Sequence, residues 1–160
     1  MQSKRIGIPN RQDVRLARLL KRRIVDALQL EATAKQAHWE VQGPNHIALH
    51  GLFDQIYANI DTHVAELNAV IAELGQAAAI DAGPATHGLA PVPFSEESST
   101  DHGQVADLEH QLEELRRKLH RSQSKMSRLG NAHALTACSG LMHDVDKYCQ
   151  VLTALLHPTH

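Results

Sequence analysis

The chain has 160 residues, of which 42% are hydrophobic and only 3% aromatic, and its formal net charge is -2 with histidine counted as neutral. A chain of this length can bury a core without disulfides or a structural metal, so we expect one domain over residues 1–160. The nearly balanced charge does not demand a polyanionic partner. Few aromatics and scattered β-branched residues favour helices over sheets, which predicts an all-α fold.

The first predicted helix covers about residues 13–41, where apolar side chains recur at steps of three and four residues. Gly43 and Pro44 end this helix, and Asn45 is suited to cap the next one. The amino-terminal end is locally basic, and we expect residues 1–12 to form a flexible basic tail. Against the single acid Asp13, residues 1–23 contain Lys4, Arg5, Arg11, Arg15, Arg18, Lys21, Arg22 and Arg23.

The second predicted helix covers about residues 47–74 and carries a regular apolar face, with Gly75 as its C-terminal cap. Residues 76–100 are rich in glycine and proline, which interrupt helices, and this predicts a long crossover connection. A third helix is predicted up to Leu129 by a near-heptad spacing of apolar residues, and a fourth begins after Gly130 and Asn131. Four long helices with short first and last links and one long middle link predict a ferritin-like four-helix bundle.

The two cysteines, Cys138 and Cys149, stand eleven residues apart in the last predicted helix. At ~1.5 Å rise per residue they are roughly 16 Å apart and cannot bridge within that helix. They share its apolar face, which favours a role as small buried hydrophobic residues. No apolar run approaches the ~18 residues of a membrane span and no leader peptide opens the chain, so we expect no membrane partner and a cytoplasmic location.

Three candidate metal ligands occur close together in the sequence. His50 and Asp54 are four residues apart on one helix face, and His38 ends the preceding helix. Two imidazoles and a carboxylate suit Fe(II), Zn(II) or Mn(II). His46 lies one turn before His50 and extends the same row. Because the chain has 12 histidines, exposed histidines on a solvated face remain the competing interpretation.

The stretch His-Trp-x-Val-x-Gly-Pro-Asn-x-Ile-Ala-Leu-His-x-Leu-Phe-Asp, at residues 38–54, closely resembles the signature of Dps-type mini-ferritins. The likeness continues along the second helix and at Asp146, Lys147 and Tyr148, and covers about half of the chain. The resemblance implies a hollow homo-dodecamer with a ferroxidase site at each two-fold interface. It also implies that His38, His50 and Asp54 are the iron ligands that one subunit supplies.

The sequence departs from the family at the two positions where the partner subunit normally supplies an Asp and a Glu, because Ala65 and Ala69 stand there. Alanine offers neither an oxygen ligand nor negative charge, so rapid iron oxidation at the usual site is in doubt. Asp61, one turn before Ala65 on the same face, is one substitute, and His46 or His63 is another. The alternative is a vestigial site.

Three functions therefore stay open. The first is an iron-handling enzyme that oxidises and stores Fe(II) and protects DNA. The second is a shell or DNA-compacting protein without efficient ferroxidase activity, and the third is a bundle that binds zinc or another divalent metal at His46, His50 and Asp54. The basic amino terminus fits sequence-independent DNA binding through a cationic tail, or a solvated helix face whose arginines pair with acids such as Asp26. The charged residues 109–128 are expected to be a solvated face stiffened by ion pairs between residues four apart.

Overall fold

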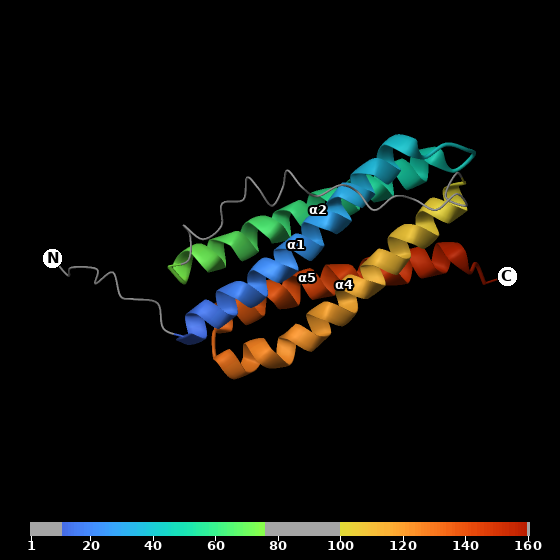
Figure 1. The fold of residues 1–160 in the computed structure, drawn as a ribbon. Coiled ribbons are helices and arrows are strands. Elements are labelled where there is room, and N and C mark those ends of the chain that lie inside the picture. The colour runs from blue at the N-terminus through green and yellow to red at the C-terminus, as the bar shows by residue number, and fades with distance from the viewer. Residues whose placement is uncertain (1–10, 76–99, 160) are drawn as a thin grey trace.

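The computed structural model describes residues 11–75 and 100–159, which form four long helices (Figure 1). They are α1 (Arg11–Glu40), α2 (His46–Glu73), α4 (Asp101–Leu129) and α5 (Ala132–Leu156). The predicted all-α, ferritin-like four-helix bundle is therefore confirmed. Most of the predicted tail and crossover lies outside the described residues. Two residues of the predicted tail, Arg11 and Gln12, belong to α1 instead. The last residue of the predicted crossover, Thr100, is the N-cap of α4.

The helix ends follow local sequence signals. Thr100 and Asn131 cap α4 and α5 by accepting hydrogen bonds from backbone amides three residues later, at 3.1 and 2.9 Å. The C-cap of α2 is Leu74 rather than the predicted Gly75, which follows it; Gly75 and Gly130, the C-cap of α4, both adopt the left-handed conformation that favours glycine. Asn45 occupies the N-cap position of α2, as predicted, but its side chain makes no capping hydrogen bond. Its ψ of 7° lies outside the extended region from which such a side chain reaches the first turn.

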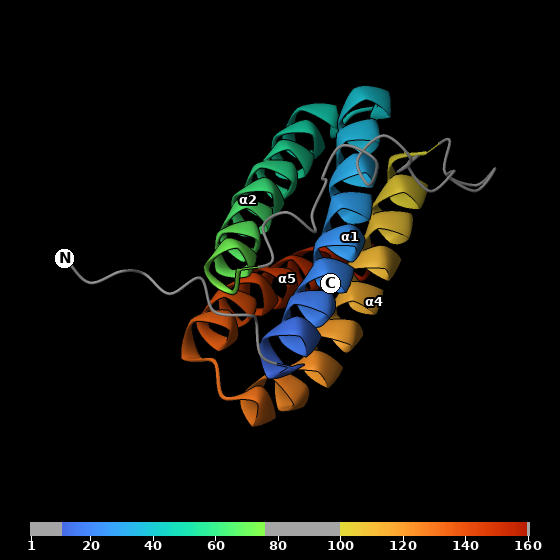
Figure 2. The same ribbon diagram turned by 60° about the vertical axis from the view of Figure 1, so that its left-hand side comes forward.

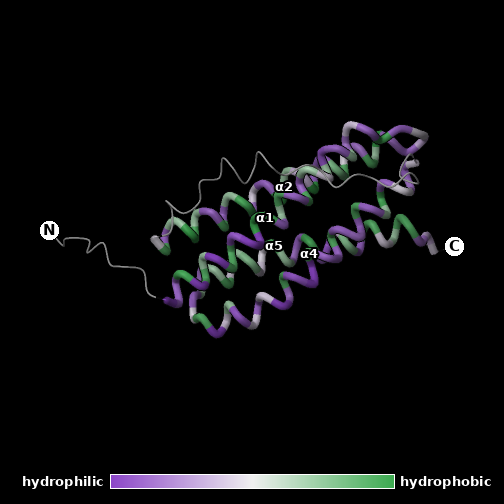
Figure 3. The backbone as a smooth tube through the Cα atoms, in the orientation of Figure 1, coloured by the Kyte–Doolittle hydropathy of each residue, from purple (hydrophilic) through white to green (hydrophobic). Residues whose placement is uncertain are grey.

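Each helix buries one apolar stripe in the centre of the bundle, and the views in Figures 1 and 2 show α1 running beside both α2 and α4. Purple and green segments alternate along every helix in Figure 3, as expected for amphipathic helices. Phe53 of α2 and Tyr148 of α5 are among the largest fully buried side chains. The buried Tyr148 hydroxyl is bonded to the Asn59 amide, so this polar group is satisfied within the core.

A polar network joins α1 to α4 near the middle of the two helices. Arg23 pairs with Asp26 at 3.0 Å, and Asp26 also accepts from Lys118 of α4 at 2.7 Å. Arg23 Nη1 donates to the Lys118 carbonyl and to Ser122 Oγ, both at 3.1 Å. The prediction that arginines of this helix pair with Asp26 is confirmed for Arg23.

The turn between α1 and α2 rests against the start of α4. Gly43 has a φ of 112°, and a Cβ placed there would lie 2.6 Å from Asp101 Oδ2. The positive φ is what favours glycine here, because the contacting Asp101 carboxylate is the end of a side chain and can turn aside. This turn sets how the end of α1 meets the beginning of α2.

Cys138 and Cys149 are free and buried. Burial raises the pKa of Cys138 to about 11 and that of Cys149 to about 12, so both stay protonated near neutral pH. Their predicted role as small buried hydrophobic residues is confirmed. None of the helices in residues 11–75 and 100–159 combines the length and the apolar character that crossing a membrane requires.

Candidate metal site

The end of α1 and the first two turns of α2 bring the three predicted ligands together. His38 Nδ1 lies 3.8 Å from Asp54 Oδ1, and the ring centroids of His38 and His50 are 3.5 Å apart. His50 and Asp54 share a face of α2 because four residues are about one helical turn. The reversal at Gly43 then places His38 opposite them. The spacing in the sequence therefore corresponds to a real cluster in space.

His38 Nδ1 is the atom that points most directly to a missing ligand. It is buried and has no hydrogen-bond partner among the described residues, although Asp54 Oδ1 faces it. A separation of 3.8 Å is too long for a hydrogen bond, and an unpaired buried polar atom is costly. An ion bound at about 2.1 Å from both atoms would subtend an angle of roughly 130°, so a small closure of the pair reaches common metal geometries.

The cluster is not a finished metal site. Among residues 11–75 and 100–159, no group of three His, Cys, Asp or Glu side chains is already arranged to hold an ion. The rings of His38 and His50 are tilted by 40° and stacked on each other. At least one imidazole must turn before both nitrogens and the Asp54 carboxylate can converge. The residues fit one ion with three protein ligands, and they fit a pair of ions poorly.

The surroundings of the cluster are open to solvent on one side. A cavity of about 90 Å³ is lined by Lys35, His38, Trp39, Asp54 and Tyr57. The Asp54 side chain is 68% exposed, while His38 is only 18% exposed. Trp39 is 75% exposed and meets His38 edge to face, with ring centroids 5.5 Å apart. Small ions can therefore reach the ligands directly.

The two histidines predicted as substitutes interact elsewhere. His46 Nδ1 lies 3.0 Å from the Gly43 carbonyl oxygen, at the surface. His63 Nε2 lies 2.7 Å from Asp144 Oδ2 of α5, and its Nδ1 lies 3.3 Å from Glu66 Oε2. Both ring nitrogens of His63 are thus already engaged, which leaves it no nitrogen for a metal in this arrangement.

Asp61 lies on the seam between α1 and α2, near Glu31 of α1. Burial raises the pKa of Glu31, the negative charge of Asp61 raises it further, and Lys35 opposes the shift. Sequence reasoning missed Glu31, although an acid two turns before His38 is visible in the sequence. The substitute role of Asp61 stays a prediction.

Ala65 and Ala69 are exposed on α2. Ala65 follows Asp54 by eleven residues, which rotates it by only ~20° and moves it ~16 Å along the axis. The two alanines and the Asp54 carboxylate therefore lie on nearly the same side of α2. Any molecule that covers this side would meet both the metal ligands and the alanines.

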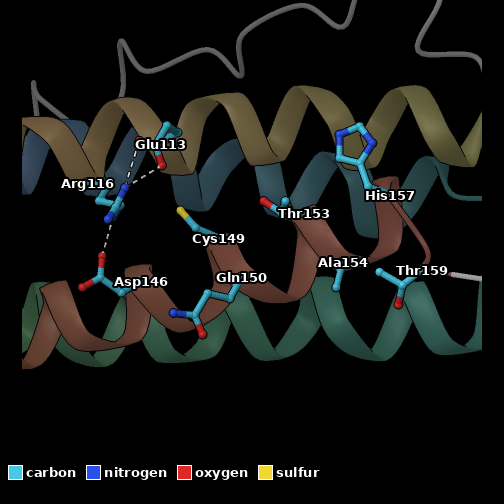
Figure 4. A pocket seen from close by; sticks show the side chains of 9 residues that line it. All are labelled: Glu113, Arg116, Asp146, Cys149, Gln150, Thr153, Ala154, His157 and Thr159. Carbon is cyan, nitrogen blue, oxygen red and sulfur yellow. Dashed lines mark hydrogen bonds and ion pairs between the residues drawn. The ribbon is translucent and has the colours of Figure 1, made fainter.

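A larger cavity of about 540 Å³ lies between α4 and α5 and holds no comparable donor set (Figure 4). Arg116 fills one end, where its Nε donates to Asp146 at 2.7 Å and its Nη1 to Glu113 at 3.1 Å. These hydrogen bonds raise the pKa of Arg116 and satisfy both acids. Arg116 and Glu113 form an ion pair within residues 109–128, but they are three residues apart rather than the predicted four, and the bond to α5 was not foreseen.

Comparison with known proteins places the chain among ferritin-like folds. The Dps protein of Mycobacterium smegmatis superimposes with a TM-score of 0.82 at 21% identity, over 99% of this chain and 100% of that one. Antigen TpF1 from Treponema pallidum gives a TM-score of 0.80 at 18% identity, over 94% and 97%. The Dps protein of Vibrio cholerae O1, described as a ferritin-like diiron-carboxylate protein, gives 0.73 at 19% identity, over 98% of both chains.

Sequence comparison adds a shorter match. A DNA protection during starvation protein from Agrobacterium fabrum is 32% identical over 57 residues, which is 36% of this chain and 35% of that relative. No protein-family model matches the chain. The chain therefore has the fold of the ferritin-like four-helix proteins. Within that class, the resemblance to Dps-type mini-ferritins that residues 38–54 indicate is confirmed.

Proposed function

We propose that this protein is a Dps-like iron-binding protein that takes up Fe(II) at His38, His50 and Asp54 and limits oxidative damage to DNA. The observation that carries the proposal is the buried, unpartnered Nδ1 of His38 facing the Asp54 carboxylate at 3.8 Å. Two imidazoles and one carboxylate are a donor set suited to Fe(II). Iron is the substrate here, and His38 and His50 supply nitrogen ligands while Asp54 supplies the oxygen.

The charge balance at this cluster predicts that Fe(II) is bound more readily than it is oxidised to Fe(III). One carboxylate leaves Fe(II) with a net charge of about +1 and Fe(III) with about +2 in a half-buried site, and extra positive charge is costly there. Further carboxylates would favour the ferric product, but alanines stand at the two positions where the resemblance expects them. We therefore expect slow ferroxidase chemistry at this cluster.

The proposed protein works as a homo-oligomer, by resemblance a dodecamer, in the cytoplasm. Two exposed apolar side chains flank the candidate site, since Trp39 is 75% and Ile47 is 78% exposed. Exposed large apolar side chains near one site are compatible with an interface, and aromatic residues are enriched there. A second subunit seated there would also cover the side of α2 that carries Ala65 and Ala69.

A second function is favoured by the exposed alanines themselves. A shell that kept the architecture but lost efficient oxidation would show this pattern, with the ligands of one subunit present and both carboxylates of the other replaced. Such a shell could still hold Fe(II), or a non-redox ion such as zinc at His46, His50 and Asp54. The metal content of purified protein separates the iron and zinc versions of this alternative.

Fe(II) binding and oxidation test the proposal together. Fe(II) titration without oxygen measures binding, and stopped-flow absorbance of the ferric product, with and without peroxide, measures oxidation. We expect His50→Ala with Asp54→Ala to abolish tight Fe(II) binding. The matched control is His110→Ala with Glu114→Ala, an exposed pair one turn apart on α4 at 3.7 Å. Equal Fe(II) affinity in both double variants would overturn the proposed site.

Restoring the missing carboxylates distinguishes the two functions. Ala65→Asp with Ala69→Glu should speed iron oxidation if a partner subunit presents these positions to the ligands. Ala132→Asp with Ala154→Glu is the control, because these alanines are also exposed but lie on α5 rather than on the ligand side of α2. A gain in rate confined to the first pair supports an interface site. Rapid iron oxidation by the wild-type chain would instead rule out the second function, a shell without efficient ferroxidase activity.

A further inference from the structure

The cavity at the candidate metal site contains a cation as well as metal ligands. Lys35 and Tyr57 line it beside His38 and Asp54, on the seam where α1 and α2 run side by side (Figures 1 and 2). Lys35 precedes His38 by three residues, and Tyr57 follows Asp54 by three residues. Because the two helices are antiparallel, Lys35 and Tyr57 lie about one turn from the ligands in the same direction along the seam.

The Lys35 ammonium is held at the cavity without being neutralised. Its Nζ lies 5.4 Å from the centroid of the Tyr57 ring, which is a cation–π contact. An aromatic ring attracts a cation but carries no net charge to cancel it. Within the described part of the chain, Lys35 forms no ion pair, and its side chain is exposed. The ammonium therefore keeps its full charge beside the metal ligands.

Two acids lie further along the same seam, and neither forms an ion pair with Lys35. Glu31 stands one turn before Lys35 on α1, and Asp61 stands one turn after Tyr57 on α2. Burial first, and then the charge of Asp61, raise the pKa of the Glu31 carboxyl, while Lys35 lowers it. Glu31 thus gives up its negative charge more readily than an ordinary glutamate and competes less for the ammonium.

A metal ion bound at this site would lack both negative charge and oxygen ligands. A divalent ion with the Asp54 carboxylate and the Lys35 ammonium carries a net charge of about +2, which is costly in a half-buried cavity. Two imidazoles and one carboxylate also leave coordination positions open. A single anion from solution would correct both deficits.

We propose that this site binds a dianionic oxyanion of the phosphate type together with the metal ion, with Lys35 as the second partner of the anion. One oxygen would bind the ion at about 2.1 Å, and another would accept a hydrogen bond from the Lys35 ammonium at about 2.8 Å. The three residues from Lys35 to His38 span ~4.5 Å along α1, which is within reach of one tetrahedral anion. Its charge of about -2 balances the excess.

This inference rests on the proposed metal site and names the small anion that enters it. The anion would supply the negative charge that the exposed Ala65 and Ala69 do not offer. Because binding free energies are coupled in both directions, metal would tighten phosphate binding by the same factor by which phosphate tightens metal binding. Metal uptake at this site would then respond to the phosphate concentration.

The test measures this coupling with Co(II), a probe ion that is not readily oxidised. Calorimetric Co(II) titrations of full chains are made at constant ionic strength in chloride, phosphate or hydrogen carbonate. We expect phosphate to tighten Co(II) binding about 10-fold in wild type and about 2-fold or less in Lys35→Gln. Lys35→Arg keeps the charge and should retain most of the coupling. Lys125→Gln, which alters an exposed lysine of α4, is the matched control and should behave as wild type does.

Two results would overturn the anion site: Co(II) affinity that phosphate leaves unchanged in wild type, or equal coupling in Lys35→Gln and Lys125→Gln. A larger effect of hydrogen carbonate that depends on Lys35 would overturn the dianionic ligand. Circular dichroism first checks that every variant folds as wild type does. Tight Co(II) binding that ignores phosphate removes the anion and leaves the metal site standing. Co(II) binding that is absent in all three anions, or that survives His50→Ala with Asp54→Ala, removes both.

Discussion

Helix α2 contributes to two histidine–carboxylate pairs that differ in separation and burial. His38 and Asp54 join α1 to α2 with 3.8 Å between Nδ1 and Oδ1, and Asp54 is 68% exposed. His63 and Asp144 join α2 to α5 with 2.7 Å between Nε2 and Oδ2, and Asp144 is 21% exposed. The first pair leaves a buried nitrogen unpartnered, whereas the second satisfies its histidine at both nitrogens.

This difference distinguishes a structural histidine, His63, from a candidate metal ligand, His38. Burial works against ionisation of Asp144, but hydrogen bonds from His63 and Lys147 outweigh it and lower the pKa of the Asp144 carboxyl. That pair stabilises the fold by itself. The open pair contributes little to the fold as it stands, and its geometry improves only when something binds between its atoms.

The largest expected effect is on metal affinity at the open pair. His38→Ala removes the buried nitrogen and should weaken Fe(II) binding by at least about 100-fold, since even residues that only support a ligand are worth 10–100-fold. Isothermal titration with Fe(II) without oxygen measures the loss. His63→Ala serves as the control and should bind as wild type does. Equal weakening in both variants would remove the distinction between the pairs.

The next effect is on stability at the closed pair. His63→Ala leaves Asp144 partly buried without its strongest partner and should lower the free energy of unfolding by about 1–3 kcal/mol. Urea unfolding followed by circular dichroism at pH 7 measures the change. The control is His133→Ala, because the His133–Glu73 pair is equally short at 2.7 Å but about 60% exposed. We expect this control to lose only ~0–1 kcal/mol.

The closed pair should also make stability depend on acid pH. Because the pKa of Asp144 is lower in the folded chain, its stabilisation is complete above the unfolded value of about 4 and is lost as the pH falls through the folded value. The stability gap between wild type and Asp144→Asn, about 1 kcal/mol at pH 6, should therefore shrink towards pH 3. Unfolding curves at several pH values measure it, and a gap independent of pH would contradict this account.

The smallest effect is expected on stability at the open pair. Asp54→Asn should change the free energy of unfolding by less than about 0.5 kcal/mol, because a long, exposed ion pair contributes little. Urea unfolding in the presence of a chelator checks this value. A loss as large as that of His63→Ala would show that the two pairs support the fold equally.

Most of the fold could be predicted from the sequence because its signals are local. Apolar periodicity located all four helices, and Gly43, Gly75 and Gly130 marked their ends within a few residues. The predicted crossover ends at residue 100, and Thr100 is indeed the N-cap of α4. The cluster of His38, His50 and Asp54 was predictable for the same local reason, since one short turn separates its parts.

Contacts between distant residues were not predictable. His63 and Asp144 are 81 residues apart, and nothing in either helix alone indicates that they meet. The sequence marked the start of α1 as basic, but it did not indicate that Lys118 of α4 shares Asp26 with Arg23. Only the packing of the bundle brings these three charges together.

Gly43 shows how one backbone angle fixes the geometry of the cluster at the turn. Its φ of 112° is a conformation that L side chains rarely adopt, and its carbonyl oxygen accepts a hydrogen bond from the His46 amide. The metal ligands on either side owe their alignment to this reversal, although Gly43 supplies no ligand itself. A substitution at this position would therefore act on metal affinity through the backbone, without altering any of the three ligands.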